Sequence, residues 1–196
     1  MQKRSTMRKL VSTVVVLVAF AALVTVGTLA LFTDSASVAS NTFSTGTLDI
    51  SASPTSALVT YSAMAPGDTV TNPLVVTNSG SMQLRYAISG SATNADAKGL
   101  KDQLVLTIKT IDVTTPASPC NDFDGTQLYS GDLDSTAGKL VGDNTSGSQS
   151  GDRTLAASAS ETLCFRVNLP LATGNTFQNA STTATFTLDA EQTANN

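Results

Sequence analysis

The 196-residue chain contains no histidine and no tryptophan, only two cysteines, and only 13% charged residues. Without an imidazole, a chain cannot build a Ser-His-Asp or Cys-His catalytic site, an H-E-x-x-H zinc helix or any other histidine-ligated metal centre. These absences exclude most hydrolase mechanisms. We therefore expect no catalytic residue, no bound metal and no cofactor.

Basic side chains are scarce beyond the N-terminus. Four of the eleven, Lys3, Arg4, Arg8 and Lys9, lie in the first nine positions, which leaves 7 basic against 15 acidic side chains in the rest of the chain. An acidic and sparsely charged domain has no electrostatic means of holding phosphate backbones. Nucleic acid is therefore not an expected partner.

Residues 10–33 carry no charge, and the stretch from Val14 to Val26 is almost wholly apolar. With basic residues before it, this layout is typical either of a secretory signal peptide or of a single anchor helix whose N-terminus stays inside. The polar residues at 25, 27 and 28 weaken the segment as a permanent span. We favour the signal peptide, which contacts the membrane only before it is cleaved.

The residues at the C-terminal end of this apolar segment indicate where signal peptidase cuts. Thr28-Leu29-Ala30 places small residues three and one before a cut between Ala30 and Leu31, as signal peptidases require. Ser37-Val38-Ala39 is a second acceptable exit, but it lies farther from the apolar core. The sequence therefore predicts a signal peptide at residues 1–30.

The residues around this exit also match a known junction. After G-T-x-A come an aromatic and an acidic residue, Phe32 and Asp34, and then N-T-F-x-x-G-T-L-D at residues 41–49. MAPGD follows at 64–68, and NSGS at 78–81 precedes an alternating strand. Together these features resemble the TasA/camelysin family, whose members are exported through a SipW-type signal peptidase.

The resemblance implies a secreted β-sandwich that assembles into fibres of the extracellular biofilm matrix. The new N-terminal segment would act as a strand given to a neighbouring subunit. Camelysin members have also been classed as metallopeptidases. Here the chain departs from the family, because it has neither histidine nor a zinc-binding helix.

The chain after residue 30 alternates apolar and polar residues with the period of two that indicates half-buried strands. Four runs are strong and four are weaker. The strong runs are 82–88, 104–113, 163–169 and 184–188, and the weaker ones are 43–50, 58–61, 70–77 and 127–133. We therefore predict an all-β fold at residues 41–196, a two-sheet antiparallel β-sandwich of jelly-roll-like form that follows the N-terminal signal helix.

Turn residues separate these runs. Pro66-Gly67 predicts a type II turn, and Asn78-Ser79-Gly80 predicts a hairpin between 70–77 and 82–88. Proline cannot donate to a strand ladder, so Pro73 places its strand at an edge or a bulge. Residues 94–103 are expected to form a short helix or an ordered loop, and residues 132–153 a mobile loop.

Cys120 and Cys164 are the only cysteines. Export and an even count favour one disulfide between them, while two separate thiols and a reactive nucleophile are the alternatives. A nucleophilic cysteine would lack the general base that activates it. A bridge would join the loop around Cys120 to a strand face opposite the core residues.

Two acidic pairs, Asp122/Asp124 and Asp132/Asp134, suggest calcium, which prefers carboxylate and carbonyl oxygens on a flexible loop. The spacing does not fit the twelve-residue calcium loop, because Gly138 comes one place late and no glutamate closes the loop. A solvated acidic loop is the favoured interpretation. A carboxylate pair for glycosidic cleavage is less favoured still.

Residues 31–40 would form an N-terminal arm after cleavage. Leu31, Phe32 and Val38 are its only large apolar side chains. Such an arm can be disordered, fold back onto its own sheet, or add to the open edge of another subunit. The family resemblance favours strand donation, with these three residues as assembly contacts.

The favoured hypothesis is a secreted, non-enzymatic structural protein at the cell surface or in the extracellular matrix. Its partner is a second copy of itself, joined head to tail into fibres. The competing hypothesis is a monomeric adhesin or binding module that makes contacts through residues 122–153. A camelysin-like metallopeptidase ranks third.

Overall fold

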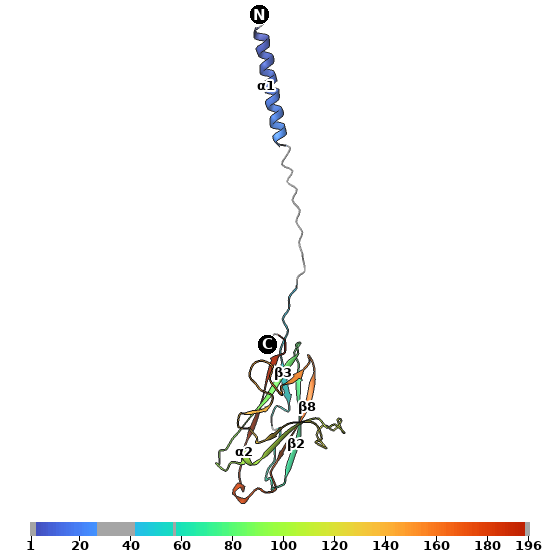
Figure 1. The fold of residues 1–196 in the computed structure, drawn as a ribbon, viewed down its shortest axis with the longest axis vertical. Helices are drawn as coiled ribbons and strands as arrows, with labels where there is room; N and C mark the ends of the chain where they lie inside the picture. Colours follow the sequence, from blue (N-terminus) through green and yellow to red (C-terminus); the bar gives the residue numbers. More distant parts are fainter. Residues whose placement is uncertain (1–2, 27–41, 57, 195–196) are drawn as a thin grey trace. The chain divides into compact units, whose positions relative to one another are not determined.

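The computed structural model describes residues 3–26, 42–56 and 58–194. Helix α1 (Lys3–Val26) belongs to one compact unit, which ends at Phe43, and the strands belong to a second, which begins at Ser44 (Figure 1). Among the described residues, no helix combines the length and the apolarity needed to cross a membrane.

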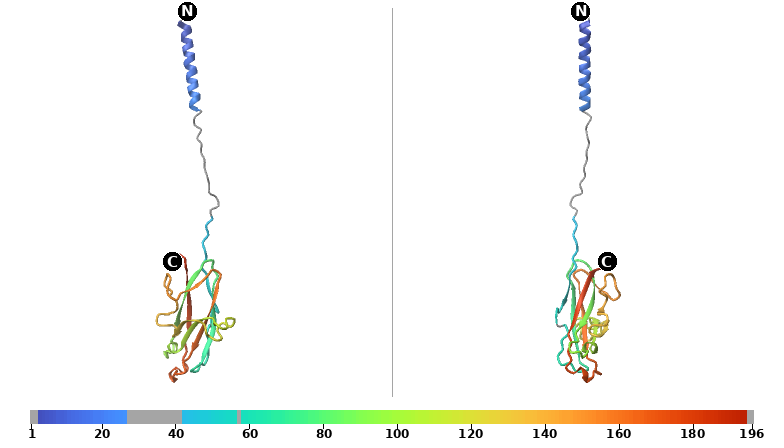
Figure 2. Two further views of the ribbon diagram at one scale, coloured as in Figure 1. Left: turned by 45° about the vertical axis from the view of Figure 1, so that its right-hand side comes forward. Right: turned by 90° about the vertical axis from the view of Figure 1, so that its left-hand side faces the viewer.

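The second unit is the predicted all-β sandwich of two antiparallel sheets (Figure 2). Sheet A contains, in spatial order, β1 (Ile50–Ser53), β2 (Thr69–Asn78), β8 (Ser160–Asn168), β4 (Val105–Thr110) and β5 (Gln127–Gly131). In sheet B, β3 (Leu84–Ala92) pairs along its whole length with β9 (Ala184–Gln192) and, on its other side, with β6 (Lys139–Val141) and β7 (Arg153–Leu155).

The core lies between the two sheets and follows the predicted alternation. Inward-facing side chains from β3, β4 and β8 are almost fully buried, and they include Leu84, Tyr86, Ile88, Leu106, Ile108, Leu163, Phe165 and Val167. Phe165 of sheet A meets Phe186 of sheet B with ring centroids 5.3 Å apart. Aromatic pairs of this kind add to the stability that burial provides.

One side of the sandwich has unpaired strand edges. β1 covers only the end of β2, from Val75 to Asn78, so Thr69–Leu74 pair with no described strand on that side. Among the described strands β9 pairs only with β3. Because β5 and β6 approach each other on the opposite side, the free edges of β2 and β9 flank the same opening.

The strong runs became β3, β4, β8 and β9, and two of the weaker ones became β2 and β5. The prediction of a strand over 43–50 was wrong except at Ile50, because this stretch only lies against the turn after β2: Ser79 and Ser81 donate their amides to the Asp49 and Thr47 carbonyls. The predicted strand at 58–61 does not form either. Its apolar side chains pack on the core, and no described residue forms a backbone hydrogen bond with it.

The turn at Pro66-Gly67 is confirmed, with Gly67 at φ 95° and the Asp68 amide bonded to the Ala65 carbonyl at 2.9 Å. The hairpin at Asn78 is wrong, because β2 and β3 belong to different sheets. The buried Asn78 side chain instead holds a corner between the sheets: its amide donates to the carbonyls of Met82, Leu155 and Ala156.

Pro73 lies where β1 does not reach, which confirms its predicted place at an edge. The short helix in 94–103 is also confirmed, as α2 (Leu100–Gln103), and a 3-10 turn, η1 (Asn175–Phe177), precedes β9. The prediction of a loop throughout 132–153 was wrong, because this stretch contributes the strand β6 to sheet B.

Candidate functional site

The free edges of β2 and β9 enclose a groove with a volume of about 1280 Å³. It opens onto the hydrophobic core, and side chains of both sheets form its floor: Val70, Leu74, Leu104, Val167, Phe186 and Leu188. Two connections form its walls, one between β1 and β2 and the other at residues 177–183. An extended segment with apolar side chains fits such a site.

None of the described residues that line the groove carries a charge. Apart from its apolar floor, the lining is rich in hydroxyl groups, notably from Thr182, Thr183 and Thr185. A charged side chain inside the groove would find no partner among these residues. The interior of the groove therefore favours apolar, serine and threonine side chains.

The groove lies at one end of the sandwich, where β2 begins, β8 has just ended and β9 begins. The chain enters the sandwich at the other end, where Thr47 and Asp49 bond to the turn after β2 and where Gln192 at the end of β9 pairs with Leu84. Chain entry and groove therefore lie toward opposite ends of the sandwich.

The residues that the sequence predicts for cleavage and assembly cannot be placed against this groove. Ala30, Leu31, Phe32 and Val38 lie outside the described residues.

Cys120 and Cys164 form the predicted disulfide, with Cα atoms 5.4 Å apart. The disulfide holds residues 111–126 against the outer face of sheet A. Under this loop the Arg166 guanidinium lies 3.7 Å from the centroid of the buried Phe123 ring, and burial lowers the pKa of Arg166. Lys109 donates to the Phe123 carbonyl at 2.9 Å. The disulfide thus closes a small secondary core.

The acidic residues of this loop accept hydrogen bonds from the loop itself. Asp122 accepts from the Thr115 hydroxyl at 2.8 Å and Asp124 from the Thr114 hydroxyl at 2.6 Å, which lowers the pKa of Asp124. Asp134, in the second predicted pair, forms an ion pair with Lys101 at 2.9 Å. These hydrogen bonds and this ion pair hold the two loops in place.

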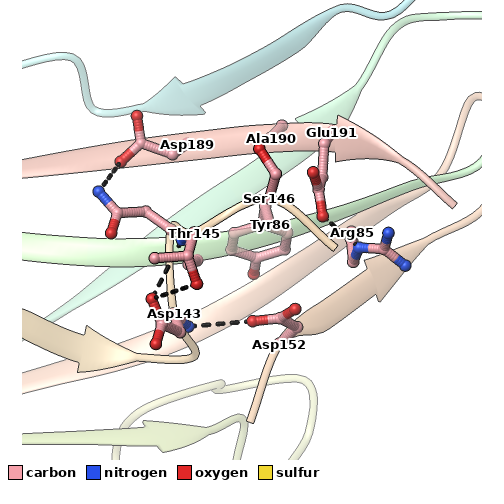
Figure 3. A pocket seen from close by; sticks show the side chains of 11 residues that line it. Arg85, Tyr86, Asp143, Thr145, Ser146, Asp152, Asp189, Ala190 and Glu191 are labelled. Carbon is pink, nitrogen blue, oxygen red and sulfur yellow. Dashed lines mark hydrogen bonds and ion pairs between the residues drawn. The ribbon is translucent and has the colours of Figure 1, made fainter. Parts of the chain in front are cut away.

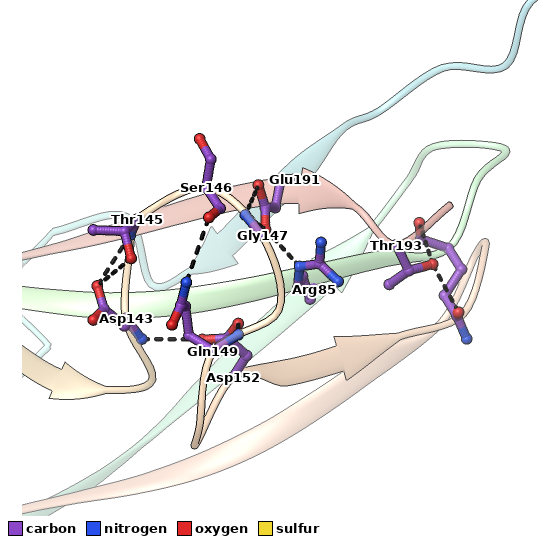
Figure 4. A network of polar contacts seen from close by, with 10 residues as sticks. Arg85, Asp143, Thr145, Ser146, Gly147, Gln149, Asp152, Glu191 and Thr193 are labelled. Atoms are coloured by element: carbon purple, nitrogen blue, oxygen red, sulfur yellow. Dashed lines mark hydrogen bonds and ion pairs between the residues drawn. The ribbon is translucent and has the colours of Figure 1, made fainter. Parts of the chain in front are cut away.

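A smaller pocket of about 180 Å³ lies on sheet B, where the loop 142–152 meets β9 (Figure 3). The Asp143 amide donates to Asp152 at 3.0 Å, and the Gly147 amide donates to Glu191 at 3.0 Å (Figure 4). Glu191 also pairs with Arg85. The carboxylates here hold the loop against the sheet, and the pocket is a gap within that network.

Sequence reasoning missed the groove. Its floor could be read from the alternation of 184–188, but its walls at 58–64 and 177–183 carry no motif. Only the short length of β1 and the edge position of β9 create the opening.

A family model described as camelysin metallo-endopeptidase matches residues 5–196. No curated protein matches the chain. The chain's residues do not fit the metal that this description implies: there is no histidine, both cysteines are in the disulfide, and the described residues include no group of three His, Cys, Asp or Glu side chains that could hold an ion. The match nevertheless extends over nearly the whole sequence, and the chain therefore belongs to the camelysin family, as its resemblance at residues 27–50 indicated.

Proposed function

We propose that this chain is a secreted structural protein whose subunits join head to tail into extracellular fibres. Each subunit, cleaved after Ala30, gives residues 31–40 as a strand to the groove of the next. The observation that carries the proposal is an uncharged apolar groove between two unpaired strand edges.

The placement of the groove supports head-to-tail growth. The chain enters the sandwich at the end opposite the groove. A subunit that gives its arm from one end and accepts an arm at the other makes a heterologous contact, which continues into a filament when it does not close on itself.

Of the two edges, β9 is the better acceptor. Pro73 lies on the free part of β2 and lacks an amide to donate, a common means of blunting an edge. β9 contains no proline, and it points Ala184, Phe186 and Leu188 toward the groove. A strand paired to β9 would gain backbone hydrogen bonds and place Phe32 and Val38 on one face as apolar anchors, with Leu31 on the opposite face because side chains alternate along a strand.

The peptidase activity in the family's description is not part of this proposal, because the chain has no histidine and its described residues include no group of side chains that could hold a metal ion. Nor does any observation favour the adhesin alternative, since the acidic side chains of 122–153 bond largely within their own loops.

Removal of residues 31–40 tests the proposal. Mature protein that begins at Leu31 should form filaments in electron microscopy. Protein that begins at Asn41 should stay monomeric on sizing and keep its thermal transition, because the arm precedes every described strand. Filaments of the shortened protein would refute donation by this arm.

A point substitution sharpens this test. Phe32→Ser should reduce filament yield strongly, since it removes about 2 kcal/mol of apolar burial from every joint. Ser35→Thr in the same arm is the matched control and should assemble normally. Equal yields would show that the arm's apolar groups do not make the contact.

The cleavage position is tested by the intact mass of the secreted protein. The mass should correspond to Leu31–Asn196. A mass that begins at Ser40, or full-length protein in the membrane fraction, would contradict the predicted processing.

A further inference from the structure

Residues 58–64, which we call the cover segment, form one wall of the groove. They belong to the connection between β1 and β2. Leu58, Val59 and Met64 are partly buried and pack against the hydrophobic core. The cover segment therefore already occupies part of the apolar surface that an incoming strand would need.

Side chains alone hold the cover segment in place. No backbone hydrogen bond joins residues 58–64 to any other described residue, and the first such bonds come at Ala65. Tyr61 is 50% exposed and lies beside Asp68, whose charge raises the pKa of the Tyr61 phenol. Ala63 has φ 57°, a left-handed conformation that costs a non-glycine residue free energy.

The strand edges next to the cover segment carry backbone hydrogen-bonding groups that the cover segment does not use. Over residues 184–188, β9 pairs with no described strand other than β3, and the cover segment makes no backbone pairing with it. An extended strand could supply apolar side chains and a row of hydrogen bonds together. The cover segment competes because it is tethered to β1 and β2, so it acts at a high effective concentration.

We propose that the cover segment closes the groove of a free subunit and is displaced when a donor strand enters. This inference rests on the proposed function and adds a regulatory step to it. Free subunits would resist joining at low concentration, because the cover segment must first leave the groove. Assembly would then be limited by the small fraction of subunits in which the groove is open.

The test uses protein that begins at Asn41, which cannot donate its own arm, and a synthetic peptide of residues 31–40 as the probe. The double variant Leu58→Ser/Val59→Ser removes two apolar contacts of the cover segment, and Met64→Ser removes the third independently. Val113→Ser is the matched control, because Val113 is 71% exposed and lies outside the groove.

The cover variants should bind the peptide about tenfold more tightly than the parent or the control, since more of the protein is open. Peptide binding to the parent should also speed chymotrypsin cleavage at Tyr61, because the displaced segment becomes accessible. All variants should keep the parent's circular dichroism. Equal affinities together with an unchanged cleavage rate would overturn the inference.

A fluorescent apolar dye separates this inference from the proposed function. If no protein binds the peptide, the arm is not the donor. Dye binding alone then tests whether the cover segment closes the groove. Stronger dye binding by the cover variants than by the parent and the control would support closure of the groove, and equal dye binding would refute it.

Discussion

At the scale of single residues, Asn78 shows how a polar side chain can decide topology. Its amide nitrogen donates to the carbonyls of Met82 at 2.8 Å and Ala156 at 3.0 Å, and its oxygen accepts from the Gly80 amide at 2.9 Å. These bonds satisfy buried backbone groups at the corner between the sheets. The family's NSGS turn motif at 78–81 is therefore a structural corner in this chain.

Asn78→Ala should lower the free energy of unfolding by about 2 to 3 kcal/mol, because it leaves buried carbonyls without a donor. Urea denaturation measures the loss. Asn144→Ala, at an exposed asparagine, is the control and should change stability by less than about 0.5 kcal/mol. An equally mild effect at both positions would contradict the structural role of Asn78.

Tyr86 is the second decisive residue. It is buried between the sheets, and its hydroxyl donates to Glu161 at 2.6 Å, while Glu161 also pairs with Arg153. Burial and this hydrogen bond raise the pKa of Tyr86. Burial also raises the pKa of Tyr129, and the Asp68 charge raises that of Tyr61.

All three tyrosines of the chain should therefore ionise above their ordinary pKa of 10.0. The folded state holds these phenol protons more tightly than the unfolded chain does. The stability from them is thus intact below pH 10 and falls as the pH rises further. Phenolate absorbance and urea midpoints against pH measure both effects.

Tyr86→Phe provides the control for this pH dependence. It should cost about 1 kcal/mol at neutral pH through the lost hydrogen bond. It should also flatten the alkaline fall in stability, because the phenol whose pKa is raised by burial between the sheets is gone. An unchanged alkaline slope would show that Tyr86 does not contribute to it.

At the scale of elements, the loop 111–126 and strand β8 act as one unit through the Cys120–Cys164 disulfide. The bridge spans a sequence separation of 44 residues and covers the small core around Phe123. Arg166 and Lys109 of sheet A lie over the Phe123 ring, so the loop contributes packing as well as a cross-link.

Replacing both cysteines by serine should destabilise the protein by up to about 4 kcal/mol, from loop-closure entropy. The main sandwich should still form, because both sheets keep their pairing partners. Thermal unfolding with and without reductant measures the effect. Reductant should lower the midpoint of the parent and leave the serine variant unchanged; a parent that is insensitive to reductant would contradict a stabilising bridge.

At the scale of the whole molecule, the separation of chain entry from the groove gives the subunit two different ends. If subunits join as we propose, a subunit without residues 31–40 can accept a strand but cannot give one. It should therefore terminate filaments at one end, as any one-sided unit does in heterologous assembly.

Mixing shortened protein that begins at Asn41 into full mature protein should shorten the filaments. Mean filament length should fall roughly in inverse proportion to the shortened fraction, as measured by electron microscopy. Shortened protein that also carries Phe186→Lys places a charge in the groove and should not terminate growth. Equal shortening by both would contradict acceptance at the groove.

The sequence by itself determined the fold class and much of the core. Alternation identified β3, β4, β8 and β9 because their inward faces are apolar over several residues, a local signal. The two cysteines limited any disulfide within the chain to one pairing, since no third was available, and the structure confirms it. The junction at residues 27–50 indicated the family that the whole-chain match confirmed.

Only the tertiary structure decided where strands end, which edges stay free and where the chain crosses between sheets. Residues 43–49 have a strand-like sequence but bond only to the turn after β2, and residues 58–61 have no backbone partner among the described residues. A strand exists only when another strand supplies its hydrogen bonds. The groove has the same origin. It depends on β1 ending at Ser53 and on β9 lying at an edge, which are properties of register and packing that no single stretch of sequence contains.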